Sequence, residues 1–329
     1  MSQHGTIRGT HHLTFCVGRA QEDYDFHVRV LGLRSIKKTV LFDGPLPVYH
    51  LYYANSVGEA GTVLTSFPYR HVGWMGQRGS NQLRRMNLAV PPESLGFWAD
   101  RLRSHAIEVE EVERFGTQRL HFSHPSGVEY GMVAFDEPRS AEPWEAHGVT
   151  GDAAVLSVHG TTTSVHQPGP HAHYLVEGLG AEEVGHEGAH HQYRIGQDGG
   201  HGRFLEVVEE PELPQGTWNF GEGTIHHQAL DVVDSGSQAE VKDHLVGLGY
   251  TDASDVKDRG YFFSVYSRSP GGALIELAWS RPEGWSIDEP ADELGTHMCI
   301  PPHWEDRRAE IAQLEDIRTD EPLEEGAPA

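Results

Sequence analysis

The segment THHLTFCV, residues 10–17, decides how the chain is read, because apolar and polar side chains alternate along it. This alternation predicts a β-strand with two different faces. The apolar face would pack against a helix expected near residues 21–33. His12 and Thr14 lie on the opposite face, so we expect their side chains to point away from the helix and into a cavity.

The unit that begins with this strand recurs along the chain. Each copy has an apolar opening strand, a helix of about a dozen residues, several further strands, a glycine-containing turn and an apolar closing strand. The opening strands are expected at residues 10–17, 82–90, 155–165 and 224–232. The sequence therefore predicts four βαβββ modules.

Two columns of residues support the repeat. Aligning the opening strands places His12, Arg85, Gly160 and His227 in one column, and aligning the closing strands places Thr65, Gly131, Glu206 and Glu276 in the other. Within each module the two column residues are separated by 46 to 53 positions. A separation that stays this similar over four copies favours repetition over chance alignment.

Such modules predict an α+β fold. A sheet with one helix-covered face needs cover for its second face, so two modules can meet and enclose a cavity. We expect four βαβββ modules forming two pseudo-symmetric halves, each enclosing a cavity between curved mixed sheets. The expected divisions are an N-terminal half at 1–150 (modules 1 and 2), a C-terminal half at 151–282 (modules 3 and 4), a C-terminal extension at 283–314 and a disordered acidic tail at 315–329.

Composition narrows the class of protein. The 329 residues contain 25 Lys and Arg against 49 Asp and Glu, and the formal net charge of −24 argues against nucleic acid as a partner. No apolar run approaches the roughly 18 residues of a membrane span, and residues 1–9 lack a signal-peptide pattern. Only two cysteines are present, which suits a reducing compartment, so a cytoplasmic location is expected.

The columns place His12, His227 and Glu276 on cavity-facing strand positions. Glu276 stands in an otherwise apolar strand, where an unpaired charge is expensive to bury. Two imidazoles and one carboxylate are typical of mononuclear non-haem Fe(II) oxygenases, and the same set can hold catalytic Zn(II). The competing interpretation is a pair of ordinary buried histidines and a glutamate paired with an arginine. In module 3, Glu206 accompanies Gly160 rather than a histidine, so no metal is expected there.

A second group of polar residues lies on the strand before the last closing strand, in the segment RGYFFSVYSR, residues 259–268. Tyr266 can donate or accept a proton, and Arg259 can hold an anionic oxygen. An aromatic edge contact and a solvated arginine are the alternative.

Taken together, the motifs GTHHLTFCV, GTIHHQALDV, RGYFFSVYSRSPGGALIELA and ELGTHMCIPPHWEDRR resemble the vicinal oxygen chelate superfamily. Within it the chain is similar to the hydroquinone-type ring-cleaving dioxygenases. The resemblance implies Fe(II), or Mn(II) in its place, held by His12, His227 and Glu276. The implied residues around the metal are His11, Thr14, His226, Arg259 and Tyr266. Gly160 in the histidine column favours this branch over catechol-cleaving relatives, and Gln228 departs from an expected aliphatic residue.

The implied reaction joins O2 to a small aromatic diol. The metal would bind a substrate hydroxyl, His226 or Tyr266 would take its proton, Tyr266 and His11 would assist O–O cleavage, and Arg259 would stabilise negative charge. The alternatives are a catechol 2,3-type extradiol dioxygenase, a glyoxalase or isomerase with a fourth protein ligand, and a metal-free binding protein. A homo-oligomer is possible.

Overall fold

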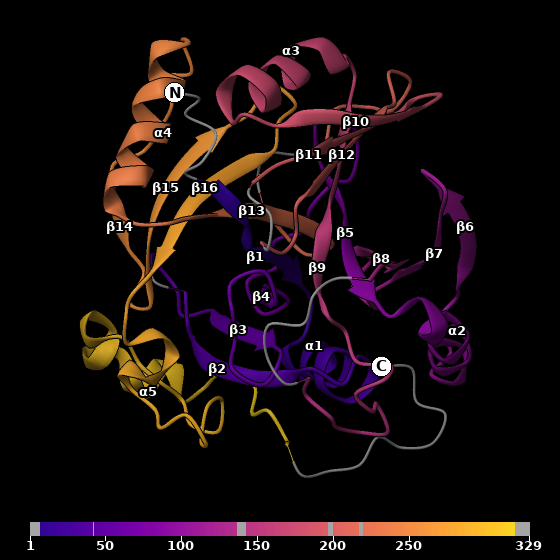
Figure 1. Ribbon diagram of the computed structural model, residues 1–329. Coiled ribbons are helices and arrows are strands. Elements are labelled where there is room, and N and C mark those ends of the chain that lie inside the picture. Colours follow the sequence, from indigo (N-terminus) through magenta and orange to yellow (C-terminus); the bar gives the residue numbers. More distant parts are fainter. Residues whose placement is uncertain (1–6, 42, 137–142, 197–199, 217–219, 320–329) are drawn as a thin grey trace.

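Two eight-stranded mixed sheets curl around separate concave faces in the computed structural model, which describes residues 7–41, 43–136, 143–196, 200–216 and 220–319 (Figure 1). The first sheet runs in the order β14 (Lys257–Asp258), β15 (Phe262–Arg268), β16 (Leu274–Ser280), β13 (Thr224–Val232), β1 (Ile7–Val17), β4 (Val63–Pro68), β3 (Tyr49–Ala54), β2 (Arg34–Val40). The second runs in the order β10 (Glu182–Glu187), β11 (His190–Arg194), β12 (Phe204–Glu209), β9 (Ser157–Val165), β5 (Gln82–Val90), β8 (Glu129–Ala134), β7 (Thr117–Ser123), β6 (Glu110–Arg114).

One helical segment belongs to each module. These segments are α1 (Ala20–Tyr24) continuing as a π-helix (Asp25–Val30), a 3-10 turn (Pro92–Ser94) leading into α2 (Leu95–Ser104), α3 (Pro168–His173) continuing as a π-helix (Tyr174–Gly178), and α4 (Ser235–Gly247). Asp234 caps α4, since its side chain accepts a hydrogen bond of 2.8 Å from the backbone N–H of Ser237. The C-terminal extension adds two 3-10 turns (Gly284–Ile287, Pro302–Arg307) and α5 (Arg308–Ile311).

The alternation predicted for β1 is confirmed. Leu13, Phe15 and Val17 are fully buried in the large core beneath the helices. His12 and Thr14 are equally inaccessible but belong to a polar cluster on the other face. A strand with both faces covered thus carries an apolar row toward the core and a polar row toward the cavity.

The sheets divide the chain differently from the expected halves at 1–150 and 151–282. β1 of module 1 pairs antiparallel with β13 of module 4, and β5 of module 2 pairs antiparallel with β9 of module 3. The prediction that modules 1 and 2 form one half is therefore wrong about strand pairing. Each opening strand has a free edge after it has paired with its own closing strand. Because the four modules are similar, the sequence does not show which other module provides the strand that pairs with this edge.

The registers confirm the repeat itself. In the first sheet Thr14 stands opposite His227 on one side and Thr65 on the other. In the second sheet Asn87 stands opposite Gly160 and Gly131 in the same way. The two sheets are therefore pseudo-symmetric, and each strand of the first has a counterpart strand in the second.

Gln228, the departure noted in the sequence, faces away from the cavity. Its Oε1 accepts a 2.6 Å hydrogen bond from Thr161 Oγ1, and its Nε2 donates a 3.0 Å bond to Thr10 Oγ1. The side chain is 1% exposed and lies where the two sheets meet. Its role is to join the sheets, so it does not contact a ligand in the cavity.

The C-terminal extension is ordered beyond residue 314. Ile317 is buried, Arg318 N donates a 2.7 Å hydrogen bond to Gln21 Oε1, and Arg29 Nη2 donates a 3.0 Å bond to the Arg318 carbonyl oxygen. Disorder from residue 315 onward is thus wrong for 315–319, because one apolar side chain in the acidic segment finds the core. Residues 320–329 lie outside the described part of the chain.

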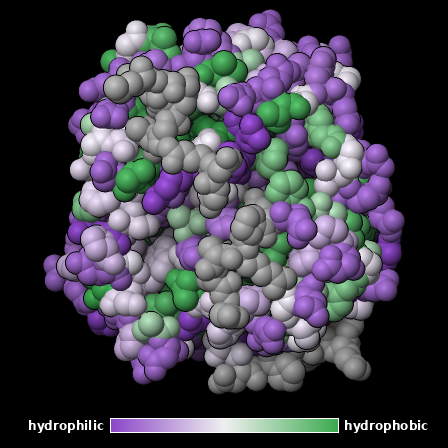
Figure 2. Space-filling view, in the orientation of Figure 1, coloured by the Kyte–Doolittle hydropathy of each residue, from purple (hydrophilic) through white to green (hydrophobic). Residues whose placement is uncertain are grey.

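The surface agrees with the acidic composition, since most of the face in Figure 2 is hydrophilic with hydrophobic side chains scattered over it. None of the helices in the described ranges has the length and apolar character needed to cross a membrane.

Candidate metal centre

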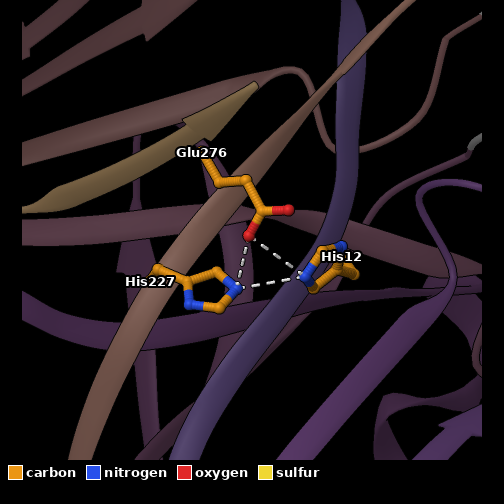
Figure 3. A group of neighbouring side chains, drawn as sticks. All are labelled: His12, His227 and Glu276. Carbon is orange, nitrogen blue, oxygen red and sulfur yellow. Dashed lines mark hydrogen bonds and ion pairs between the residues drawn. The ribbon is translucent and has the colours of Figure 1, made fainter. Parts of the chain in front are cut away.

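Three donor atoms from three strands converge on one point of the first sheet's concave face (Figure 3). His227 Nε2 on β13 lies 2.9 Å from Glu276 Oε2 on β16 and 3.1 Å from His12 Nε2 on β1. His12 Nε2 lies 3.6 Å from the same carboxylate oxygen. Among the described residues, no fourth His, Cys, Asp or Glu joins this group. The arrangement offers two nitrogens and one oxygen to a single ion.

Glu276 is a buried carboxylate with an incomplete set of partners. Its side chain is fully inaccessible, and Oε1 accepts a 2.5 Å hydrogen bond from Ser264 Oγ. No described donor makes a hydrogen bond of sound geometry to Oε2. Burial alone would raise the pKa of Glu276, but the imidazoles of His12 and His227 and the Ser264 hydroxyl lower it below its ordinary value. An anionic oxygen aimed at two imidazole nitrogens fits a cation.

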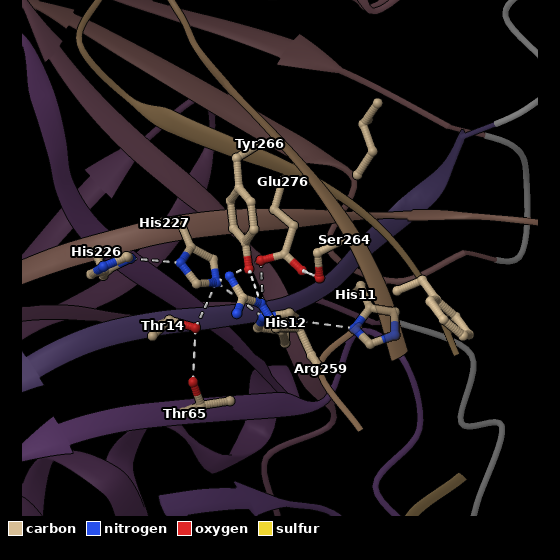
Figure 4. A network of polar contacts seen from close by, with 12 residues as sticks. His11, His12, Thr14, Thr65, His226, His227, Arg259, Ser264, Tyr266 and Glu276 are labelled. Atoms are coloured by element: carbon tan, nitrogen blue, oxygen red, sulfur yellow. Dashed lines mark hydrogen bonds and ion pairs between the residues drawn. The ribbon is translucent and has the colours of Figure 1, made fainter. Parts of the chain in front are cut away.

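The two histidine doublets supply outer partners for the inner imidazoles (Figure 4). His11 Nδ1 lies 2.8 Å from His12 Nδ1, and His226 Nδ1 lies 2.7 Å from His227 Nδ1. If the Nε2 lone pairs of the inner histidines bind an ion, their protons sit on Nδ1 and are donated to the outer rings. The outer rings then carry their own protons on Nε2, and His11 Nε2 can donate to Ser280 Oγ at 2.8 Å.

The outer imidazoles are neutral. Burial lowers the pKa of His11, and burial followed by the charge of His227 lowers that of His226 well below its ordinary value. Neutral partners can accept the Nδ1 protons of the inner rings, whereas imidazolium ions could not.

A chain of hydroxyl groups links Nε2 of His227 to the cavity wall. Thr14 Oγ1 lies 2.8 Å from His227 Nε2 and 2.8 Å from Thr65 Oγ1. Thr65 Oγ1 lies 3.0 Å from His50 Nε2, whose other nitrogen lies 2.9 Å from the Tyr52 hydroxyl. Burial lowers the pKa of His50 well below its ordinary value, so this ring is neutral as well.

Tyr266 on β15 and Arg259, which lies between β14 and β15, are next to the three donors. Tyr266 is the cross-strand neighbour of Glu276, and Arg259 Nε donates a 3.2 Å hydrogen bond to the Tyr266 hydroxyl. Burial and the charge of Glu276 raise the pKa of Tyr266, so it remains a phenol. Arg259 also pairs with Asp43, which excludes the solvated-arginine alternative.

The donors open onto a cavity of about 860 Å³. Aromatic and aliphatic side chains form most of its wall, and both inner histidines, His226, Arg259 and Tyr266 line it. His11 does not line it and acts from behind His12. A buried polar group at one side of an apolar cavity is the usual form of a small-molecule site.

The counterpart position in the second sheet holds an ion pair instead. Glu206, the counterpart of Glu276, receives a 2.7 Å bond from Arg119 Nη1 and a 3.2 Å bond from Thr162 Oγ1. Gly160 replaces the second histidine for a steric reason, since an added Cβ would lie 1.8 Å from the carbonyl oxygen of Phe204. A guanidinium therefore occupies the position beside Glu206.

Asp23, His27 and His124 form another compact polar group, buried beneath α1. Its hydrogen bonds argue against a metal. His124 Nδ1 accepts from the Ser126 N–H at 2.9 Å, so the proton is on Nε2, which faces Asp23 Oδ1 at 3.5 Å. The His27 Nδ1 donates to the Asp23 carbonyl oxygen at 2.9 Å. Neither ring presents a lone pair to an ion between them, and the group is a structural network.

All eight residues predicted for the site lie within this neighbourhood. Reasoning from the sequence missed Ser264, Thr65, His50 and Tyr52. Ser264 could have been found, because it alternates with Tyr266 on the face of β15 that borders Glu276. The sequence pattern did not indicate that His50 belongs to the site. Its counterpart on β7 is Arg119, so the two modules have different residue types at this position.

The two curled sheets of paired modules define a protein of the vicinal oxygen chelate superfamily, and this donor set is its candidate metal centre. In agreement, glyoxalase I from Zea mays has the same fold, with a TM-score of 0.58 at 13% identity over 82% of this chain and 92% of that one. No family model matches the sequence.

Individual proteins give a narrower assignment. The chain is 38% identical to a chlorohydroquinone/hydroquinone 1,2-dioxygenase of Sphingobium indicum, over 93% of this chain and 95% of that protein. It is 35% identical to MhqO of Bacillus subtilis, named as a ring-cleaving dioxygenase, with the same two coverages. The crystal structure of a Bacillus subtilis protein named as a dioxygenase superposes with a TM-score of 0.88 at 34% identity, covering 95% of this chain and 98% of that one. The chain belongs to the family of ring-cleaving dioxygenases that contains these relatives.

Proposed function

We propose that this protein is an Fe(II)-dependent dioxygenase that cleaves the ring of a hydroquinone with O2, and that His12, His227 and Glu276 hold the metal. The observation that carries the proposal is the convergence of three metal-binding atoms, from opposite ends of the chain, at the edge of a largely apolar cavity. Family membership alone would not locate the chemistry. This convergence supports the proposed location of the reaction.

The residues present fit a divalent metal. The orphaned Oε2 of Glu276 and the two Nε2 atoms are ligands that Fe(II), Mn(II) and Zn(II) accept. When bound, the metal lowers the pKa of a substrate hydroxyl and leaves open positions for small molecules. Three protein ligands rather than four favour an oxygenase over a glyoxalase or isomerase of this superfamily.

The surrounding side chains act as hydrogen-bond donors. Tyr266 keeps its phenolic proton, because burial and Glu276 raise its pKa, and it receives the Arg259 Nε–H. It can therefore donate to an oxygen atom in the cavity, while the guanidinium stabilises charge that develops there. His226 carries its proton on Nε2 for the reason given above, so it too is a donor rather than the proton acceptor suggested by the resemblance.

His50 is a further polar group on the cavity wall. Its ring is neutral, it lines the cavity, and Thr65 and Thr14 connect it to the metal-facing nitrogen of His227. Because burial lowers the pKa of His50 well below its ordinary value, this ring can accept a hydrogen bond from a substrate hydroxyl but is a poor base for its proton.

The test is anaerobic loading with Fe(II), Mn(II) or Zn(II), followed by O2 consumption on hydroquinone and on catechol. We expect one metal per chain, O2 uptake with Fe(II) on hydroquinone exceeding that on catechol, and a ring-opened product that has gained both atoms of ¹⁸O2. Full Fe(II) occupancy without O2 uptake would defeat the proposal, and faster uptake on catechol would favour the catechol-cleaving alternative.

A further inference from the structure

The cavity is much larger than one hydroquinone ring. Eight non-hydrogen atoms fill at most about 240 Å³, allowing each the roughly 30 Å³ share of a water molecule in the liquid. The cavity volume is about 860 Å³. A ring bound at the three donors would leave most of this space for a substituent.

The space away from the donors is walled by the C-terminal extension. Ile287, Ile300, Pro301 and Pro302 line the cavity, and Ile300 also packs against the apolar cluster formed by Val40, Trp304 and Ile311. These residues follow the last closing strand, so none belongs to the four modules. In Figure 1 the extension, in yellow, lies beside β2 at the open side of the first sheet.

The extension is fastened to the sheet by a buried lysine. Lys37 on β2 is fully inaccessible, and its Nζ donates to Asp288 at 2.6 Å and to Glu289 at 2.7 Å. The Cys299 N–H donates a 2.9 Å hydrogen bond to the Lys38 carbonyl oxygen, which sets Ile300 against the strand. The apolar wall is therefore held in place before any ligand binds.

The charged groups around the cavity already have partners. Asp258 pairs with Arg281 at 2.6 Å, Arg259 pairs with Asp43, and Asp288 pairs with Lys37. A charged substituent would compete with these pairs for the same groups, whereas an uncharged apolar one only displaces water from the wall.

We propose that the preferred substrates are hydroquinones bearing a bulky, uncharged apolar substituent, and that the wall formed by Ile287, Ile300, Pro301 and Pro302 binds it. This inference rests on the proposed function for the ring itself. It predicts that affinity grows with the length of an alkyl substituent, by about fourfold for each methylene fully buried.

The experiment compares hydroquinone, methylhydroquinone, butylhydroquinone and 2,5-dihydroxybenzoate. Kd is measured anaerobically on the Fe(II)-loaded protein by tryptophan fluorescence, and kcat/KM is measured by O2 uptake. We expect butylhydroquinone to exceed methylhydroquinone at least tenfold in both quantities and the carboxylated compound to bind most weakly. I300W should abolish the butyl-to-methyl ratio and I300A should reduce it several-fold, while the exposed V184W on β10 should keep it.

Equal affinities across the alkyl series, tightest binding of 2,5-dihydroxybenzoate, or a ratio unchanged in both Ile300 variants would overturn the inference. The anaerobic Kd values report on it even if no compound is turned over. Absence of O2 uptake alone would count against the proposed function and not against the apolar wall.

Discussion

Glu276 and Glu206 occupy the same position in the two sheets and have opposite kinds of partner. Glu276 faces two imidazoles, with its Oε2 2.9 Å from His227 Nε2, whereas Glu206 accepts a 2.7 Å bond from Arg119 Nη1. The same buried carboxylate thus belongs to the proposed metal centre in one sheet and to an internal salt bridge in the other. The difference arises from residues outside the glutamate strand.

Breaking the salt bridge should therefore affect stability and leave the metal alone. R119M strands Glu206 as an uncompensated buried charge, and we expect the free energy of unfolding to fall by about 3–5 kcal/mol in urea denaturation. The double variant R119M/E206Q should recover most of this loss, because no charge then remains. Metal content should stay at one per chain, and loss of the metal in either variant would contradict the assignment of the two glutamates.

Removing an outer histidine should weaken metal binding without removing a ligand. H11A takes away the acceptor for the Nδ1 proton of His12, and we expect the metal Kd to rise about 10–100-fold in competition with a chelator. The exposed His186 supplies a matched control, since H186A should leave the Kd unchanged. An unaltered Kd in H11A would show that the 2.8 Å contact does not orient the ligand.

The Tyr266 hydroxyl should matter for the reaction more than for the metal. Y266F removes the donor that Arg259 Nε supports, and we expect kcat to fall about 10²-fold or more with metal content unchanged. The variant Y250F, whose hydroxyl contacts His173 away from the cavity, serves as the control. Wild-type kcat in Y266F would exclude the tyrosine from proton donation.

Acid should destabilise the fold through neutral buried histidines. Burial first, and then the charge of Arg119, lower the pKa of His159 to about 3. The folded pKa is below the unfolded value of roughly 6.5, so the contribution of His159 is complete above that pH and is lost as pH falls toward 3. In H159F, which keeps the stacking on Phe204, the fall in unfolding free energy should be shallower by about 1.4 kcal/mol per pH unit. Identical slopes for both proteins in urea titrations from pH 6.5 to 4 would contradict this.

The sequence predicted the modules and the convergence of His12, His227 and Glu276, because both depend on local alternation and on a repeat with similar spacing. The sequence did not predict which modules pair with each other, because the free edges of β1 and β5 have similar patterns. In the structure β1 pairs with β13 and β5 pairs with β9. The repeat did not point to His50, because the corresponding position on β7 is Arg119, a residue of different chemistry. The sequence did not predict that residues 315–319 are ordered. The burial of Ile317 depends on a single apolar side chain, and the acidic composition of the segment is the same as that of a disordered tail. Cytoplasmic location, oligomeric state and the choice of Fe(II) stay predictions.

The position of the metal itself tests the central claim most directly. Crystals of the anaerobically Fe(II)-loaded protein, measured at the iron absorption edge, should show one anomalous peak per chain, within bonding distance of His12 Nε2, His227 Nε2 and Glu276 Oε2. A peak at the Asp23 cluster or beside Glu206, with these three atoms unliganded, would contradict the account.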